Sequence, residues 1–311
     1  MRLLRTPLRV LLTATALLTA TALLAGTAAC TRTDTDQIVV TTNILGDVVR
    51  EITGDQARVT VLMKPNADPH SFGISAREAH AMQTADLVVY NGLGLEEGVL
   101  RHVGAARDEG VHTVETGALI DPLEYRDGDA AGLPDPHFWT DPQRMDTAVG
   151  LLADAIAEHV DGVDADTIRR RADAYRRKLG DLDAWMANRF AGIPAERRVL
   201  VTNHHVFGYL AQRYELAVIG AIIPSGTTLA SPSASDLASL VTAVTRHRVP
   251  AIFADSAQPQ RLAEVLAEEA DLRVRVVGLY SESLSEPGGA AATYLEMMRF
   301  NAEAIIGGLT A

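Results

Sequence analysis

Two kinds of apolar segment alternate through the first half of the chain. Short runs rich in β-branched side chains, at residues 38–42, 58–63 and 86–90, are typical of strands. The stretches between them, 44–52 and 75–83, are predicted helices. Strands that alternate with helices favour a mainly parallel sheet with helices on both faces, and such sheets bind ligands beyond the carboxyl ends of their strands.

The second half of the chain repeats this order. Its strand-like runs and one of its helices fall at residues 199–203, 217–223, 234–246 and 251–254. Asn43 and Asn203 end equivalent strands 160 positions apart, and Pro65 and Pro224 follow equivalent strands 159 positions apart. We therefore expect two similar α/β lobes, which either duplication or convergent patterning would produce.

A long helical region separates the two halves. Residues 142–160 form one predicted helix, with Asp141 as its N-cap and Pro142 at its first position. Residues 164–191 form a second helix without internal proline, about 42 Å long at 1.5 Å per residue. A helix of this length should join the lobes rigidly. The expected boundaries are 38–141 for the N-terminal lobe, 142–192 for the linking region and 193–311 for the C-terminal lobe.

The first 29 residues have the layout of a secretory signal peptide. Arg2, Arg5 and Arg9 precede an apolar run at 10–24, and small residues then lead to Cys30. The apolar run is too short for a comfortable membrane span.

The position of Cys30 resembles that of the acylated cysteine of bacterial lipoproteins. Residues 30–37 would then tether the protein to the membrane through lipid. Thr27 departs from this pattern, because lipoproteins usually carry leucine three residues before the cysteine. An ordinary secreted protein with an incidental cysteine is the alternative.

Net charge and cysteine content exclude some classes of function and of metal site. The net charge is −12, and removal of the first 29 residues, with three arginines and no acid, would make it −15. Such acidity argues against nucleic-acid binding, which needs basic patches, and is compatible with attraction of cations. A single cysteine excludes an intrachain disulfide and a cysteine-rich metal cluster.

Three of the nine histidines lie on loops at strand ends or helix starts. His70 follows a strand, His137 precedes a helix and His204 follows a strand. The first two close identical Asp-Pro-His triplets, in which proline stiffens the loop that presents the imidazole. Five other histidines lie in predicted helices or a strand without an obvious partner group: His80, His102, His112, His159 and His247.

Neutral imidazole is a strong ligand for zinc and late first-row metals. Three histidines leave one position of a tetrahedral site open, and Glu282, where a predicted strand runs into a loop, is the best candidate for it. A solvated loop carboxylate is the alternative for Glu282. The competing carboxylates are Asp68, Asp135, Asp255 and Glu286.

These motifs are similar to those of the zinc- and manganese-binding solute-binding lipoproteins of ABC importers, the cluster A-I (TroA-like) family. The resemblance covers nearly all of residues 38–308. It rests on the segments KPNADPHSF, DPHFWTDP, TNHHVFGYLAQRY, PSGTTLASPSASDL and LYSESLSEPGGAAATYLEMMRFN. It implies two α/β lobes joined by one long helix, with the metal held between them by His70, His137, His204 and Glu282. His204 is favoured over its neighbour His205.

The chain departs from the family pattern in two places. The fourth ligand is commonly aspartate in the family, and Glu282 is one methylene longer, which leaves the coordination number open. Zinc-specific members often carry a histidine-rich loop before the second ligand, whereas residues 121–134 here are acidic and contain no histidine. We therefore expect no accessory zinc collection in that loop.

The predicted function is metal capture without chemistry. A monomeric, lipid-anchored protein on the extracytoplasmic face would deliver zinc, or manganese as second choice, to an ABC permease. A zinc metallohydrolase with the same three histidines is the alternative, but the His-Glu-x-x-His signature is absent. A third possibility is a surface protein that uses the metal for structure or passes it to another periplasmic partner.

Overall fold

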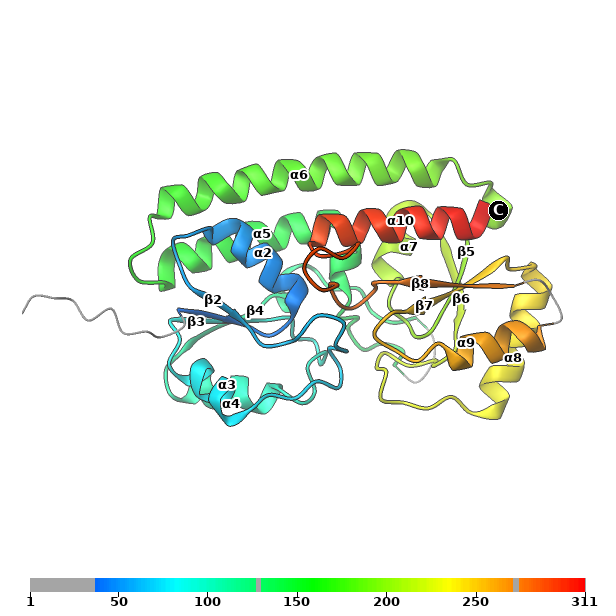
Figure 1. Cartoon of the computed structure of the whole chain (residues 1–311), viewed down its shortest axis with the longest axis horizontal. Coiled ribbons are helices and arrows are strands. Elements are labelled where there is room, and N and C mark those ends of the chain that lie inside the picture. The colour runs from blue at the N-terminus through cyan, green and yellow to red at the C-terminus, as the bar shows by residue number, and fades with distance from the viewer. Residues whose placement is uncertain (1–36, 127–129, 271–273, 311) are drawn as a thin grey trace, which may run out of the picture. The chain divides into compact units, whose positions relative to one another are not determined.

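The computed structural model describes residues 37–126, 130–270 and 274–310, and contains two four-stranded parallel sheets (Figure 1). Of the predicted signal peptide and tether, only Gln37 belongs to the described residues, so Cys30 lies outside them. Among the described residues, no helix combines the length and apolarity that a membrane span needs.

The first sheet has the strand order β2-β1-β3-β4. Its central strands are buried on both faces, as their uninterrupted apolar sequences predict. Ile38 in β1 pairs with Val59 in β2 and with Leu87 in β3. The elements of this half are β1 (Ile38–Val40), α2 (Asn43–Thr53), β2 (Val59–Val61), α3 (Ala76–Gln83), β3 (Leu87–Tyr90), α4 (Leu100–Asp108) and β4 (His112–Glu115).

The second sheet repeats that topology in the order β6-β5-β7-β8, with all pairings parallel. The elements of this half are β5 (Val199–Thr202), α7 (Gly208–Tyr214), β6 (Ala217–Ala221), α8 (Ala234–His247), β7 (Ala251–Asp255), α9 (Arg261–Glu269), β8 (Arg275–Leu279) and α10 (Tyr294–Thr310). The prediction of two similar α/β lobes is confirmed. The exact lobe boundaries stay predictions.

The linking region is a pair of helices, α5 (Pro142–His159) and α6 (Ala165–Ala191). Asp141 caps α5 as expected, because its side chain accepts a hydrogen bond from the backbone N–H of Gln143. The 27-residue α6 lies along α5 and also contacts α2 and α10 (Figure 1). One helix thus packs on elements from both halves of the chain. Its buried stripe recurs every three or four residues and consists of Ile168, Ala172, Tyr175, Leu179, Leu182, Met186 and Phe190.

The first predicted strand is two residues too long. β1 ends at Val40, and Thr41 and Thr42 form the turn into α2. The reason is a cap: the Thr42 side chain accepts a hydrogen bond from the backbone N–H of Leu45, so this threonine starts a helix although its β-branched side chain suits a strand. The carboxyl end of β1 is therefore a short turn that passes directly into a helix.

Buried polar contacts tie the two halves together near their centre. Asn43 donates to the hydroxyl of Ser283 at 2.8 Å and accepts from the backbone N–H of Leu284 at 3.0 Å. The indole N–H of Trp139 donates to the backbone carbonyl of Ser281 at 2.8 Å. These bonds hold the loop after β8 against the first half of the chain.

We expect Trp139→Phe to lower the free energy of unfolding by about 1–3 kcal/mol, because the buried carbonyl of Ser281 loses its donor. Urea unfolding followed by circular dichroism measures this loss. Trp185→Phe is the matched control. Trp185 lies half-buried on α6, so its replacement should lower the free energy of unfolding by less. Equal losses in the two variants would contradict a special role for the indole N–H.

Candidate metal centre

The two Asp-Pro-His triplets build the same local structure. In the first, the Asp68 carboxylate accepts the backbone N–H of His70 at 2.9 Å. In the second, Asp135 accepts the backbone N–H of His137 at the same distance. An aspartate that binds the N–H two residues later closes a tight turn, and the intervening proline fixes its φ. Each triplet therefore holds its histidine in a preset position.

Asp135 also orients the ring of His137. Its Oδ1 lies 2.8 Å from His137 Nδ1, so this nitrogen carries the proton that the carboxylate accepts. The lone pair of a neutral His137 ring is then on Nε2, on the side of the other histidines. A carboxylate behind a ligating histidine is the usual arrangement in metal sites, where it fixes the tautomer and raises the basicity of the ring.

The other two predicted residues come from strand ends of the second half. His204 follows β5, and the hydroxyl of Thr202 donates to its backbone carbonyl at 2.6 Å. Glu282 follows β8, and the preceding Ser281 donates through its backbone N–H to the carboxylate of Asp255 at 3.1 Å. The parallel sheet places these two strand ends at one edge, as the topology predicts.

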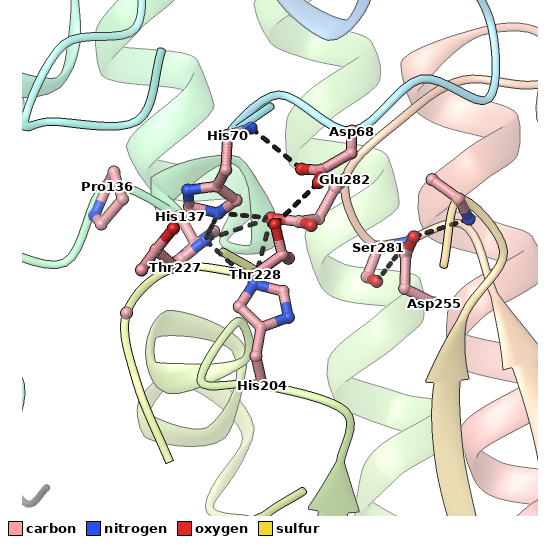
Figure 2. A network of polar contacts seen from close by, with 12 residues as sticks. Asp68, His70, Pro136, His137, His204, Thr227, Thr228, Asp255, Ser281 and Glu282 are labelled. Atoms are coloured by element: carbon pink, nitrogen blue, oxygen red, sulfur yellow. Dashed lines mark hydrogen bonds and ion pairs between the residues drawn. The ribbon is translucent and has the colours of Figure 1, made fainter. Parts of the chain in front are cut away.

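The four side chains converge on one point (Figure 2). Glu282 Oε1 lies 3.1 Å from Nε2 of His70, 3.1 Å from Nε2 of His204 and 3.3 Å from Nε2 of His137. His137 Nε2 lies 3.3 Å from His70 Nε2 and 3.4 Å from His204 Nε2. A tetrahedral ion with bonds of about 2.0–2.1 Å separates its ligand atoms by about 3.3 Å. Five of the six separations are thus those of a tetrahedral site.

Burial makes this cluster costly without an ion. The four residues are between 0% and 2% exposed. Nδ1 of His70, Nδ1 of His204 and Oε2 of Glu282 are buried without a hydrogen-bond partner among the described residues. The free Oε2 allows Glu282 to bind an ion through one oxygen or through both. Buried polar groups are nearly always paired, so three converging Nε2 atoms beside a carboxylate with an unpaired oxygen fit a cation better than a purely structural cluster.

The charges of the cluster are coupled. Burial lowers the pKa of His137, but the hydrogen bonds with Asp135 and Glu282 outweigh it and raise the pKa to about 9. Burial lowers the pKa of His204, which Glu282 only partly opposes. Burial favours a neutral Glu282, yet His204 and His70 hold its pKa well below the usual range. Near neutral pH a proton on His137 therefore balances the Glu282 carboxylate, and an incoming cation must displace it.

The remaining candidates fall outside the cluster. Asp68, Asp135 and Asp255 bind backbone N–H groups behind it, and Glu286 is exposed. None of the five histidines set aside in the sequence joins the cluster. The expectation that they lack a partner is wrong for three of them: the rings of His112 and His159 stack 3.9 Å apart, and the Arg101 guanidinium donates to Nε2 of His102 at 3.2 Å. His205 also lies outside the cluster.

Tyr125 is a site residue that the sequence analysis missed. Its hydroxyl lies 3.2 Å from His137 Nδ1 and donates to the backbone carbonyl of Gly226 at 3.4 Å. The residue belongs to the acidic segment 121–134, which drew attention only for its lack of histidine. Tyr125 is the only aromatic residue of that segment, and this was the available signal.

Comparison with known proteins supplies the family. The family described as "Zinc-uptake complex component A periplasmic" matches residues 38–308. The chain belongs to this zinc-uptake component A family. The match spans both sheets, the linking helices and the four converging side chains, so the resemblance noted from the motifs is confirmed.

The relatives of this chain carry the names of different metals. The zinc-binding protein TroA of Treponema pallidum is 29% identical over 88% of both chains. The iron-binding protein YfeA of Yersinia pestis is 29% identical over 88% of this chain and 86% of its own. The manganese-binding lipoprotein MntA of Bacillus subtilis is 29% identical over 86% of this chain and 88% of its own.

Solved structures share the fold. The periplasmic zinc-binding protein TroA from Treponema pallidum superposes with a TM-score of 0.82 at 28% identity, over 89% of this chain and all of that one. A manganese-bound periplasmic metal-binding protein from Candidatus Liberibacter asiaticus gives 0.76 at 25% identity, over 88% and 99%. All these names describe binding proteins and none describes an enzyme. The role of the four side chains as ligands stays a prediction.

We expect Asp135→Asn to lower the pKa of His137 in the metal-free protein by about 1–3 units, because the amide no longer stabilises the imidazolium. Burial then dominates and favours the neutral ring. Side-chain ¹⁵N NMR across pH 5–10 measures the titration. An unchanged His137 pKa would contradict the role assigned to Asp135.

Proposed function

We propose that this chain is the extracytoplasmic metal-binding component of an ABC importer, and that it captures zinc for delivery to a permease. The observation that carries the proposal is the convergence of three imidazole nitrogens and one carboxylate oxygen in a buried cluster between the two sheets. Residues from both halves contribute, so the ion would bridge them. His70, His137, His204 and Glu282 are its proposed ligands.

The donor set favours zinc over manganese. Three nitrogens and one oxygen suit zinc, whereas manganese prefers oxygen donors and a higher coordination number. The separations near 3.3 Å match a compact four-ligand shell, and the burial of all four residues leaves little space for added water ligands. Manganese is the second choice, because the metals named among the relatives differ and availability also decides what is bound.

The same burial argues against the metallohydrolase alternative. A catalytic zinc site usually has three protein ligands and keeps a fourth position for water. Here a fourth protein group, Glu282, would take that position, and this residue is 1% exposed. Relatives named as binding proteins of metal transporters support a carrier as well.

Capture proceeds by exchange of water for protein ligands. Coordination to Nε2 of His137 expels the proton that this ring carries near neutral pH, so Glu282 becomes free to neutralise part of the ion's charge. The bound ion and carboxylate together keep a charge of +1. Two of the four ligands come from each half of the chain, which makes the relative placement of the halves part of the affinity.

Lipid anchoring through Cys30 completes the proposal. Removal of residues 1–29 would leave the acylated cysteine at the N-terminus, with residues 31–37 as a tether to the membrane. Several relatives are named lipoproteins, including MntA of Bacillus subtilis and PsaA of Streptococcus pneumoniae. A monomer held beside the permease would need no further partner to deliver its ion.

We expect His137→Ala to reduce zinc affinity at least 100-fold, because it removes one of four ligands, while His247→Ala leaves affinity unchanged. Competition against a chromophoric chelator measures both, first with zinc and then with manganese. Equal effects of the two variants would discredit the ligand assignment. Tighter binding of manganese than of zinc would reverse the choice of metal.

Removal of the metal distinguishes a carrier from a protein that needs zinc to stay folded. We expect the chelator-treated protein to keep its helical circular dichroism, since the two sheets and linking helices have large apolar cores of their own. A structural-zinc protein would unfold instead.

A further inference from the structure

A short segment of the C-terminal lobe crosses to the other lobe beside the metal centre. Residues 225–229, here termed the strap, follow β6 and carry no helix or strand of their own. Figure 2 draws Thr227 and Thr228 of the strap together with His137, Glu282 and His204. Among the described residues, the strap touches the N-terminal lobe through three hydrogen bonds.

The first of these bonds joins the strap to the turn that carries His70. The hydroxyl of Thr228 donates to Asp68 Oδ2 at 2.7 Å. The other oxygen of the same carboxylate holds the backbone N–H of His70. The side-chain amide of Gln258, also from the C-terminal lobe, donates to Asp68 Oδ2 at 2.8 Å. The buried Asp68 carboxylate thus holds the turn that carries His70 through one oxygen. Its other oxygen binds two side chains of the C-terminal lobe.

The second bond joins the strap to the residue behind His137. The Tyr125 hydroxyl donates to the backbone carbonyl of Gly226 and lies 3.2 Å from His137 Nδ1. This approach requires glycine, because a Cβ at position 226 would lie 2.7–2.9 Å from the Tyr125 ring and hydroxyl. The third bond, from the Thr227 hydroxyl to Glu97, lies on the exposed side at 3.0 Å.

We propose that Thr228 and Tyr125 are positioning residues that set how long the bound metal is retained. The proposal rests on the proposed function of metal capture. Asp68 and Tyr125 each contact a residue that presents a ligand and also fasten the strap. Because the four ligands are almost fully buried, the ion leaves only when the lobes part locally, and the strap must then give up both bonds. Loss of either bond speeds release without removing a ligand.

The test compares zinc release from loaded wild-type protein, Thr228→Val and Tyr125→Phe. Each protein is mixed rapidly with excess chromophoric chelator, and the absorbance gives the dissociation rate. We expect a rate about fivefold to tenfold higher in each variant, as for loss of one hydrogen bond, and roughly the product of the two factors in the double variant. The association rate should stay within about twofold of the wild type, because the ligands are intact.

Two matched controls separate retention from general loosening. Thr242→Val removes a hydroxyl that binds only the carbonyl of Ala238 within α8. Tyr90→Phe removes a buried hydroxyl that contacts Arg107 and Glu115 away from the strap. Both controls should release zinc at the wild-type rate. Thr228→Ser restores the hydroxyl and should restore slow release.

The outcomes discriminate between the two proposals. Wild-type protein that binds no zinc or manganese refutes metal capture itself. Variants that bind zinc but release it within about twofold of the wild-type rate overturn the strap proposal alone. Thr228→Ser that releases zinc as fast as Thr228→Val also overturns it, because the hydroxyl then has no role.

Discussion

A buried carboxylate among three buried imidazoles is the interaction on which the rest of this structure depends. Glu282 Oε1 lies within 3.1–3.3 Å of all three Nε2 atoms, away from solvent. Burial of such charge is unfavourable unless a cation or proton compensates it. The raised pKa of His137 favours compensation by a proton on its ring, and a divalent ion is the alternative that we propose. Exchange of this proton for a divalent ion is the binding step that we propose.

The fold supplies this cluster from four separate loops. In the second half, His204 and Glu282 follow strands β5 and β8 of one parallel sheet. In the first half, aspartate and proline in each Asp-Pro-His triplet fix the turn before the ion arrives. Pre-set ligands reduce the entropy lost on binding. The ligand groups therefore meet because of topology and turn chemistry together.

Two kinds of contact join the lobes: buried packing and hydrogen bonds near the centre, and the hydrogen bonds of the strap. α6 packs along elements of both lobes, and buried bonds such as Asn43 to Ser283 hold the centre. These contacts bury apolar surface and neutral polar groups, and they favour one fixed arrangement. The strap, by contrast, is held by a few hydrogen bonds at partly exposed residues. Under the proposed function, the buried contacts would keep the lobes together while the bonds of the strap open to release the ion.

Local sequence pattern and tertiary packing determine different features of this protein. The alternation of strand and helix, the Asp141 cap and the length of α6 follow from short-range periodicity and capping chemistry, so the sequence alone determined the two-lobed α/β fold. The three loop histidines were also recognisable, because Asp-Pro-His at strand ends is a local signal, and the resemblance to a known family singled out Glu282.

Only the tertiary structure decided what surrounds them. The stacking of His112 on His159, the reach of Tyr125 to His137 and the bond from Thr228 to Asp68 join residues far apart in the chain. Such contacts depend on the packing of lobes and loops, which leaves no periodic trace in the sequence. The raised pKa of His137 belongs to this class in part, because Glu282, which helps Asp135 to outweigh the effect of burial, comes from the other half of the chain.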